Sequence, residues 1–577
     1  MHQFAKTTTA FLVTCLCLSA LAQTHRLTRT QTLGEGQLEF VTSSPSGGLV
    51  AAVSPLGIRL MDGQTGKTRL WLDASDVQGA TFDITDQWFG FCALHRCQLV
   101  DLRQNKVLHN IQLEGNVSPV GFLRGQLVVS GDGPPSFVDV RSGKVTRSAT
   151  WAAQQLFNLC GDRGFASDEV SLYFENTRRK RVKLNLPVDP DQVFIDPSCQ
   201  HLTYLHNGKL KRMNPETGEV RVLLASAPFQ TGRVLDLNDT HVVYLKAGVA
   251  HLMDLATKSS TKLPFTAGYV GLQPAGVFNY TPTLLRVLDL QGKPLWKRDH
   301  TPPIHALLLD GQTLWLDVKQ GPGHALASMN LTTGALKTHL NLQESAAFRM
   351  HKLGKDLYLT SNTATRFTPA TGKTTVVARK VSLTPENPPV YSKVAQGKYH
   401  FRNDQGMLVA FDPASNKTLV VGNEEMKGLS VSSETTYTYN GKSELFLLHP
   451  NKNTLKKTGI RVPTAEVRDL VQDVKNHRLY AVGFNTSTLF VYDLKKAKWS
   501  TVATGTEAHT LTLSPSGQFL LLQGETTVQL WNTGKLNAAT SPLTLRDLSG
   551  AALGAKEDTL YLSSQGGYVQ VYRIRKS

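Results

Sequence analysis

The sequence of 577 residues lacks long hydrophobic runs and shows almost none of the 3.6-residue periodicity that predicts amphipathic helices. Its longest apolar stretch runs from Ala10 to Leu21, about twelve residues, whereas a membrane-spanning helix needs roughly 18 to 20. The missing periodicity argues against a helical solenoid, and the missing runs argue against a membrane-spanning helix.

The short apolar stretch has the features of a secretory signal. A single Lys6 precedes it, and Ala20-Leu21-Ala22 at its end resembles a small-residue cleavage site. We therefore predict a signal peptide at residues 1–22 and a mature chain beginning at Gln23. The protein is expected to be secreted, periplasmic or associated with the cell envelope.

Cysteine is scarce, with four residues left after the signal: Cys92, Cys97, Cys160 and Cys199. None has the Cys/His spacing of a zinc site. Cys92 and Cys97 flank a short turn between two strands, so we predict a cross-strand disulfide between them. Cys160 and Cys199 occupy equivalent turns of successive repeats, but sheets packed face to face lie about 10 Å apart, so the state of this pair stays open.

Local catalytic motifs are also missing. The chain has no G-x-S-x-G elbow, H-E-x-x-H pair, P-loop or dinucleotide fingerprint. One segment gathers histidines and carboxylates that could bind a metal, but its turn signatures favour ordinary polar positions on strands and turns; these residues are His300, His305, Asp310, Asp317 and His324. We predict no catalytic residues, no metal and no cofactor, and consider an enzyme less probable than a binding protein.

What the sequence does contain is a repeat. An apolar strand ends on a short polar residue before a turn, and this slot recurs about every 39 residues. It falls at Asp62, Asp101, Asp139, Asn176, Asn214, Asp254, Asp289, Asn330, Thr368, Asp412, His449, Asp493, Asn532 and Arg573.

Each unit has room for four short strands with period-two alternation. The first unit reads LEFVTS, GLVAAVS, GIRLMD and KTRLWL, and its SPSG turn at Ser44 returns at Ser514. Four-stranded units of this length, repeated around a ring, are typical of β-propeller blades. The sequence predicts an all-β protein of fourteen blades, arranged as two tandem seven-bladed β-propellers.

Two segments carry a family resemblance. SPSGGLVAAVSPLGIRLMD and SPSGQFLLLQGETTVQLWN resemble WD-repeats, and TGKTRLW and LQGKPLW resemble the repeats of YVTN-type, quinoprotein-like propellers. The resemblance covers the mature chain and implies a fold. The adjacent-cysteine disulfide of quinone-dependent dehydrogenases is missing, so it implies no quinone cofactor.

Consecutive prolines at 302 and 303 mark the boundary between the rings, which predicts propellers at 23–299 and 300–577. The last unit ends without a fourth strand, and two segments could complete it. Either HRLTRTQTL closes the first ring and PLWKRD the second, or PLWKRD stays in its own hairpin and HRLTRTQTL crosses to the second ring.

The net charge is +17, and basic residues recur in one turn, the one that leads into the outermost strand. Basic residues there include Lys67, Lys106, Lys144, Lys293, Lys373, Lys417 and Lys535, and two denser groups, Arg178, Arg179, Lys180 and Arg181, and Lys495, Lys496 and Lys498. This basic rim could contact a polyanion. Because lysine on an edge strand also prevents sheet-to-sheet pairing, we favour that second interpretation.

The favoured function is an exported binding or scaffold protein that acts through protein–protein interaction. The alternatives are a hydrolase or lyase centred in one channel, and a binder of an anionic polymer such as an envelope polymer or nucleic acid. Neither motif nor charge identifies the partner.

Overall fold

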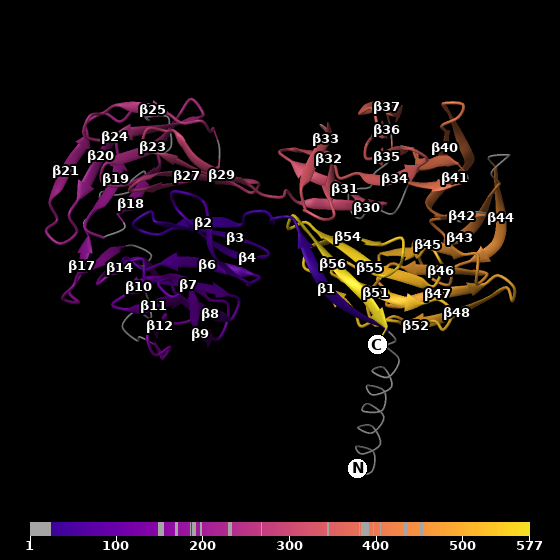
Figure 1. Ribbon diagram of the computed structural model, residues 1–577, viewed down its shortest axis with the longest axis horizontal. Coiled ribbons are helices and arrows are strands. Elements are labelled where there is room, and N and C mark those ends of the chain that lie inside the picture. Colours follow the sequence, from indigo (N-terminus) through magenta and orange to yellow (C-terminus); the bar gives the residue numbers. More distant parts are fainter. Residues whose placement is uncertain are drawn as a thin grey trace, which may run out of the picture. The chain divides into compact units, whose positions relative to one another are not determined.

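The computed structural model describes residues 25–147, 155–167, 171–184, 186, 192–196, 199–228, 234–266, 268–342, 346–379, 381, 392–395, 397–403, 405–431, 435–449 and 454–576. All regular structure in these ranges is β-strand (Figure 1). The predicted signal peptide lies outside them. Among the described residues there is no helix long and apolar enough to span a membrane.

The strands form fourteen blades in two compact units, and each unit is a seven-bladed β-propeller. One unit spans Glu35–His300, and the other combines Thr301–Ser577 with the N-terminal segment up to Gly34. In thirteen blades the strands pair antiparallel in chain order, from the innermost strand to the outermost, and in the last blade the outermost strand comes from the N-terminus. The predicted fold class is therefore confirmed.

The first propeller contains blades 1 to 7. Its strands are β2 (Phe40–Ser43), β3 (Leu49–Ser54), β4 (Gly57–Asp62) and β5 (Thr68–Leu72); β6 (Val77–Phe82), β7 (Trp88–Ala93), β8 (Arg96–Asp101) and β9 (Lys106–Gln112); β10 (Ser118–Leu123), β11 (Gln126–Ser130), β12 (Ser136–Asp139) and β13 (Val145–Arg147); β14 (Gln155–Gly161), β15 (Arg163–Ser167), β16 (Leu172–Glu175) and β17 (Arg181–Leu184); β18 (Gln192–Ile195), β19 (Leu202–His206), β20 (Lys209–Met213) and β21 (Val220–Leu224); β22 (Val234–Leu237), β23 (His241–Lys246), β24 (Val249–Asp254) and β25 (Ser260–Lys262); β26 (Tyr269–Gln273), β27 (Gly276–Thr281), β28 (Leu284–Asp289) and β29 (Pro294–Asp299).

The second propeller contains blades 8 to 14, and blades 10 and 11 share one long strand, β41. Its strands are β30 (Ile304–Asp310), β31 (Thr313–Gln320), β32 (Gly323–Asn330) and β33 (Leu336–Leu342); β34 (Arg349–Leu353), β35 (Asp356–Thr360), β36 (Ala364–Thr368) and β37 (Lys373–Ala378); β38 (Ser392–Ala395), β39 (Lys398–Arg402), β40 (Met407–Asp412) and β41 (Lys417–Val431); β42 (Thr436–Asn440), β43 (Glu444–His449) and β44 (Thr454–Arg461); β45 (Val467–Asp473), β46 (Arg478–Gly483), β47 (Thr488–Asp493) and β48 (Lys498–Ala503); β49 (Thr510–Leu513), β50 (Phe519–Gln523), β51 (Thr527–Asn532), β52 (Asn537–Ala538) and β53 (Leu543–Thr544); β54 (Leu548–Leu553), β55 (Thr559–Ser564), β56 (Tyr568–Lys576) and β1 (His25–Leu33).

The repeated SPSG forms the turn between the innermost and second strands. The Ser44 hydroxyl accepts a hydrogen bond from the Leu49 N–H at 3.1 Å, and the Ser514 hydroxyl accepts one from the Phe519 N–H at 2.9 Å. Gly47 and Gly517 adopt φ of 75° and 73°, which favours glycine. The two copies therefore have the same turn for the same local reason.

The polar slot of the repeat lies at or next to the end of the third strand in thirteen blades. In eleven of these an Asp or Asn side chain accepts backbone N–H groups of the turn that follows. In blade 1, Asp62 Oδ1 accepts the backbone N–H groups of Gln64 and Thr65. Asn330 and Asp493 do the same in blades 8 and 12. These bonds hold the pKa of Asp62 down at about 2, the Thr65 N–H contributing most. Asp and Asn recur because they complete this turn.

Apolar side chains fill the spaces between blades, and one such cluster closes the first propeller. Val50, Ala52 and Met61 of blade 1 pack against Leu285 and Val287 of blade 7. The Trp296 indole N–H also donates to the Gly63 carbonyl at 2.9 Å. Because β29 pairs with β28 in its own blade, this ring closes without a strand from elsewhere.

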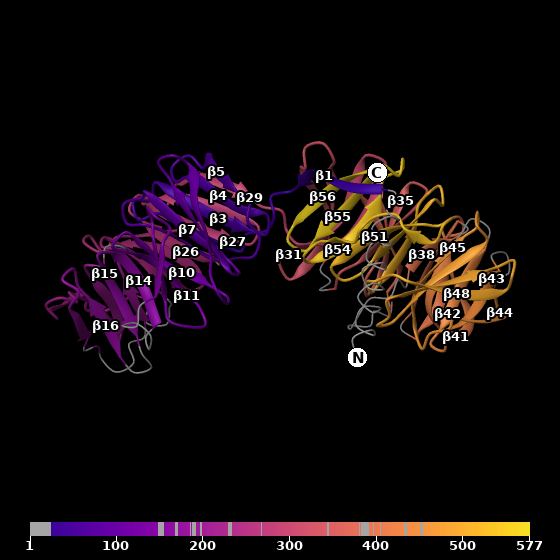
Figure 2. The ribbon, with the colours of Figure 1, turned by 90° about the horizontal axis from the view of Figure 1, so that it is seen from below.

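The second propeller closes differently, since its last blade takes its outermost strand from the N-terminus. Strand β1 pairs antiparallel with β56, from His25 opposite Lys576 to Leu33 opposite Val569 (Figure 2). Leu33 is buried in a cluster with Ile304 and Val569. Of the two closures left open by the sequence, the structure has the second. The expected range 23–299 includes β1 in the first propeller, whereas its pairing with β56 makes β1 part of the second.

Both cysteine pairs are disulfides in the structure, and both lie in the first propeller. Cys92 and Cys97 face each other across β7 and β8. Cys160 lies at the end of β14 and Cys199 in the turn before β19, with 5.6 Å between their Cα atoms. The expected 10 Å separation does not apply because both residues lie at the innermost ends of neighbouring blades, where a propeller's sheets converge.

Candidate functional site

The seven innermost strands line the channel of each propeller, and the two channels differ in charge. In the first propeller these strands contain one charged residue, Asp236 of β22. In the second they contain many ionisable side chains, among them His305, Asp310, Arg349, His351, Lys352, Lys393, Lys427, Arg468, Asp469 and Asp473. A polar site is therefore to be sought in the second channel.

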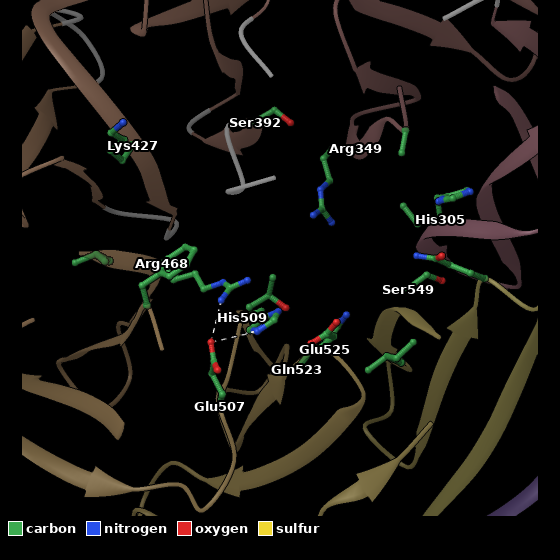
Figure 3. A pocket seen from close by; sticks show the side chains of 18 of the residues that line it. His305, Arg349, Ser392, Lys427, Arg468, Glu507, His509, Gln523, Glu525 and Ser549 are labelled. Atoms are coloured by element: carbon green, nitrogen blue, oxygen red, sulfur yellow. Dashed lines mark hydrogen bonds and ion pairs between the residues drawn. The ribbon is translucent and has the colours of Figure 1, made fainter. Parts of the chain in front are cut away.

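A cavity of about 560 Å³ opens at one end of this second channel. Every innermost strand of the propeller contributes to it, and turns between second and third strands complete the wall (Figure 3). Its polar lining residues are His305, Arg349, Thr360, Ser392, Lys427, Glu466, Arg468, Asn485, Glu507, His509, Thr510, Gln523, Glu525, Ser549 and Gln565. Its size is that of a small-molecule or peptide site.

Arg349 stands at the centre of this arrangement. It is the first residue of β34, and its side chain points into the middle of the cavity (Figure 3). Burial lowers the pKa of Arg349, while the carboxylates of Asp469 and Asp317 act in the opposite direction. A guanidinium nonetheless stays protonated at neutral pH, so the cavity contains a fixed positive charge.

The two carboxylates near Arg349 are committed to the fold. Asp469 Oδ2 accepts the Leu511 N–H of the next blade at 2.8 Å, and Asp317 Oδ2 accepts the Phe348 N–H at 2.9 Å. The second oxygen of Asp317 contacts His324 Nδ1 at 2.8 Å. Each carboxylate thus ties one blade to the next, which limits its availability to a ligand.

A second cation of the cavity, Arg468, is held in position by two contacts. The Arg468 guanidinium lies over the Phe484 ring, 4.5 Å from the ring centroid, and donates to Glu507 at 3.0 Å. Glu507 also lies 3.4 Å from His509 Nε2. Burial lowers the pKa of His509, with the Arg468 charge acting in the same direction. This group is pre-oriented for binding.

A serine–histidine pair bears on the hydrolase hypothesis. His351 Nε2 contacts Ser392 Oγ at 2.9 Å. Burial, helped by the charges of Lys393 and Arg349, lowers the pKa of His351 to about 3. A base that activates serine must become positively charged, and these surroundings oppose that charge. The pair is suited to holding the channel wall together rather than to nucleophilic catalysis.

The opposite end of the same channel holds another hollow, of about 660 Å³. The SPSG turn of blade 13 and the cations Lys352, Lys393 and Lys475 line it. Lys352 pairs with Asp310, and Lys393 contacts Asp469 at 3.3 Å. Its cations therefore have anionic partners within the propeller or, for Lys475, the Ser516 carbonyl.

Only some residues of the histidine-rich segment lie close together in the structure. His305 and His324 lie with ring centroids 4.9 Å apart, and His324 pairs with Asp317. His300 belongs to the first propeller, where its Nδ1 contacts the Gly36 carbonyl, and Asp310 pairs with Lys352. Among the described residues, a different group has possible ligand atoms close enough together to hold a metal ion, namely Asp196, His201 and Asp239.

The basic rim lies on one defined face. Antiparallel strands alternate in direction, so the turns between third and fourth strands share a face with the turns between first and second strands. The cavity opens on the other face, among turns between second and third strands such as Asn485. Arg178, Arg179 and Lys180 are exposed and Arg181 is half-buried, while Lys495, Lys496 and Lys498 are exposed. Their contact with a polyanion stays a prediction.

Sequence reasoning missed Arg349, Arg468, Glu507 and His509 because it searched for local motifs. These residues lie up to 160 positions apart and belong to three blades. A usable signal was present, namely charged residues on the predicted innermost strands of the second ring.

No protein-family model and no curated protein matches the chain. Among solved structures it is similar to PorZ, described as an essential bacterial surface component of the type-IX secretion system of Porphyromonas gingivalis, with a TM-score of 0.67 and 11% identity over 94% of this chain and 86% of that chain.

The extracellular domain of the putative one-component system BT4673 from B. thetaiotaomicron matches with a TM-score of 0.36, 11% identity and coverage of 96% and 83%. The likeness to PorZ supports the β-propeller fold alone. The narrower resemblance to WD-repeat and YVTN-type propellers stays a prediction.

Proposed function

We propose that this chain is an exported binding protein of the cell envelope, and that the cavity face of its second propeller recognises a protein partner. The observation that carries the proposal is the contrast between the channels: seven blades converge on a charged cavity in one ring, whereas the described innermost strands of the other ring contain a single charged residue. A concave site on which polar groups of several elements converge is the usual place for binding.

Three further observations support an extracytoplasmic role. The N-terminal residues have the pattern of a signal peptide, and the structure joins all four remaining cysteines as disulfides, which persist in oxidising compartments. PorZ, which has the same fold, is a bacterial surface component of a secretion system. A scaffold at the cell surface is consistent with each of these.

Site-specific crosslinking in intact cells tests the proposal. A photoreactive amino acid replaces Asn485, which is exposed at the cavity, or Lys496, which is exposed on the opposite face. We expect a defined protein adduct from position 485 and none from position 496. Equal labelling from both positions, or no protein adduct from position 485, would contradict recognition by the cavity face.

A further inference from the structure

The chemistry of the cavity limits which groups it can bind, and Arg349 sets the first limit. Its guanidinium points into the cavity from the channel wall (Figure 3). A guanidinium offers two parallel N–H donors, a geometry that matches an oxyanion with two oxygens in one plane. The cavity thus contains a recognition element for an anion.

The surrounding carboxylates limit the charge of that anion. Glu466, Glu507 and Glu525 all line the cavity, and Glu507 is shared between Arg468 and His509. Arg349, Lys427 and Arg468 balance these three carboxylates in formal charge, so a dianion such as phosphate meets no net positive charge in the cavity. A monoanion such as a carboxylate meets less repulsion, and neighbouring N–H groups on the ligand can donate to the glutamates.

The aromatic residues argue against a sugar acid as the source of the carboxylate. Sugar rings commonly stack on a free aromatic face, but Phe348 is only 1% exposed, and the Arg468 guanidinium covers one face of the Phe484 ring, which is 37% exposed. The wall instead offers the amides of Asn485, Gln523 and Gln565, which both donate and accept. Such groups are the natural partners of a peptide backbone.

From these limits we propose that the cavity binds a carboxylate carried by a peptide segment of the partner, with Arg349 as its anchor and the glutamates and side-chain amides as partners of the neighbouring peptide groups. The proposal rests on the proposed function, since it names the chemistry by which the partner would be recognised. The carboxylate can come from a chain terminus or from an aspartate or glutamate side chain.

The test uses immobilised mature protein and three pools of random acetylated tetrapeptides, with retention measured by mass spectrometry. One pool has free C-termini and no Asp or Glu, the second is C-terminally amidated and contains them, and the third is amidated and lacks them. We expect retention of the first or the second pool, which identifies the source, and none of the third. Equal retention of the third pool, or retention of no pool, would overturn the proposal.

Variants connect the retained peptides to the cavity. Arg349→Gln should weaken binding by about 10- to 100-fold, because a charge-assisted hydrogen-bond pair is lost. Arg349→Lys keeps the positive charge but loses the two parallel N–H donors of the guanidinium, and it should weaken binding by about tenfold. This variant provides the same test if Arg349→Gln folds poorly. Lys496→Gln removes one charge on the opposite face and should change binding less than twofold.

Competition and crosslinking separate the remaining outcomes. Binding of inorganic phosphate or galacturonate in place of the peptides would assign the cavity to another anion and overturn the proposal. A protein adduct at position 485 that persists unchanged in the Arg349→Gln variant would also overturn it, but would leave the proposed function standing. Loss of that adduct together with peptide retention supports both.

Discussion

The two propellers have the same blade plan but use their channels differently. Asp236, the one charged residue on the innermost strands of the first ring, accepts the Leu272 N–H of the next blade at 2.7 Å and so ties two blades together. In the second ring Asp469 makes the equivalent bond to Leu511, and a fixed cation, Arg349, faces the cavity nearby. The bonds between blades are common to both rings, while the charged cavity belongs to one.

The rings also differ in how they are held closed. Both disulfides belong to the first ring, which closes by packing between blades 1 and 7. The second ring has no cysteine and is closed by β1 from the N-terminus. One fold is thus stabilised by covalent bonds in one copy and by a strand from the N-terminus in the other, and each of these can be removed separately.

Removal of residues 25–33 should have the largest effect. It leaves β56 as an unpaired edge and uncovers the cluster around Leu33, a loss on the order of 5 kcal/mol or more, comparable to the whole stability of many domains. Limited proteolysis with mass spectrometry should then show a resistant fragment near 35–300 and rapid cleavage of the rest. Arg26→Ala, at an exposed position of β1, is the matched control. Equal protection of both propellers in the truncated chain would show that β1 is dispensable.

The Cys160–Cys199 disulfide should have the next largest effect, confined to the first propeller. It joins residues 39 positions apart, and loop-closure entropy gives it a contribution of about 4 kcal/mol. We expect the double variant Cys160→Ala, Cys199→Ala to lower the midpoint temperature of one calorimetric unfolding transition and to leave that of the other unchanged. Removing Cys92–Cys97, which closes a far shorter loop, should cost about half as much. A similar shift of both transitions would contradict the assignment of the disulfides to one cooperative unit.

The third expected effect, smaller than that of the Cys160–Cys199 disulfide, is a pH dependence of the first propeller. Burial raises the pKa of Asp236 to about 6 from 3.8, against the opposing hydrogen bonds from Leu272 and Leu237. Because the folded pKa is the higher one, this stabilisation is complete below about pH 4 and is lost as pH rises through about 6, by about 3 kcal/mol.

The comparison of Asp236→Asn with the wild type isolates this contribution. Urea unfolding of the first propeller at pH 4, 5, 6 and 7 should show that its free energy of unfolding changes less with pH in the variant than in the wild type. Asp469→Asn, in the second propeller, should leave that profile as it is in the wild type. An unchanged slope in the Asp236 variant would mean that the carboxyl does not titrate in this range.

Much of the fold could be read from the sequence because each blade is specified locally. The Asp or Asn at the end of a third strand must occur where it can accept the N–H groups of its own turn, so Asp62 and Asn330 reveal the period of the repeat. Closure could not be read in the same way. HRLTRTQTL pairs with residues more than 500 positions away, and nothing within the segment distinguishes β56 from another open edge.

The site was hidden for a related reason. Arg349 and Arg468 are ordinary strand residues in their own blades, and only the closed ring brings them to one cavity. The Cys160–Cys199 pair was likewise judged from sheet spacing, which varies with distance from the propeller axis. Sequence patterns describe neighbours along a blade, whereas the channel is made of residues that are neighbours only around the ring.

The pairing of β1 with β56 also orders events during synthesis. The Thr30 hydroxyl donates to the Val571 carbonyl, 541 positions further along, so β1, the first described strand to leave the ribosome, must wait for β56, the last described one. The first propeller, whose residues are contiguous, can fold while the chain is still growing. The second can close only after β56 has been synthesised, so its charged cavity forms after the first propeller can already have folded.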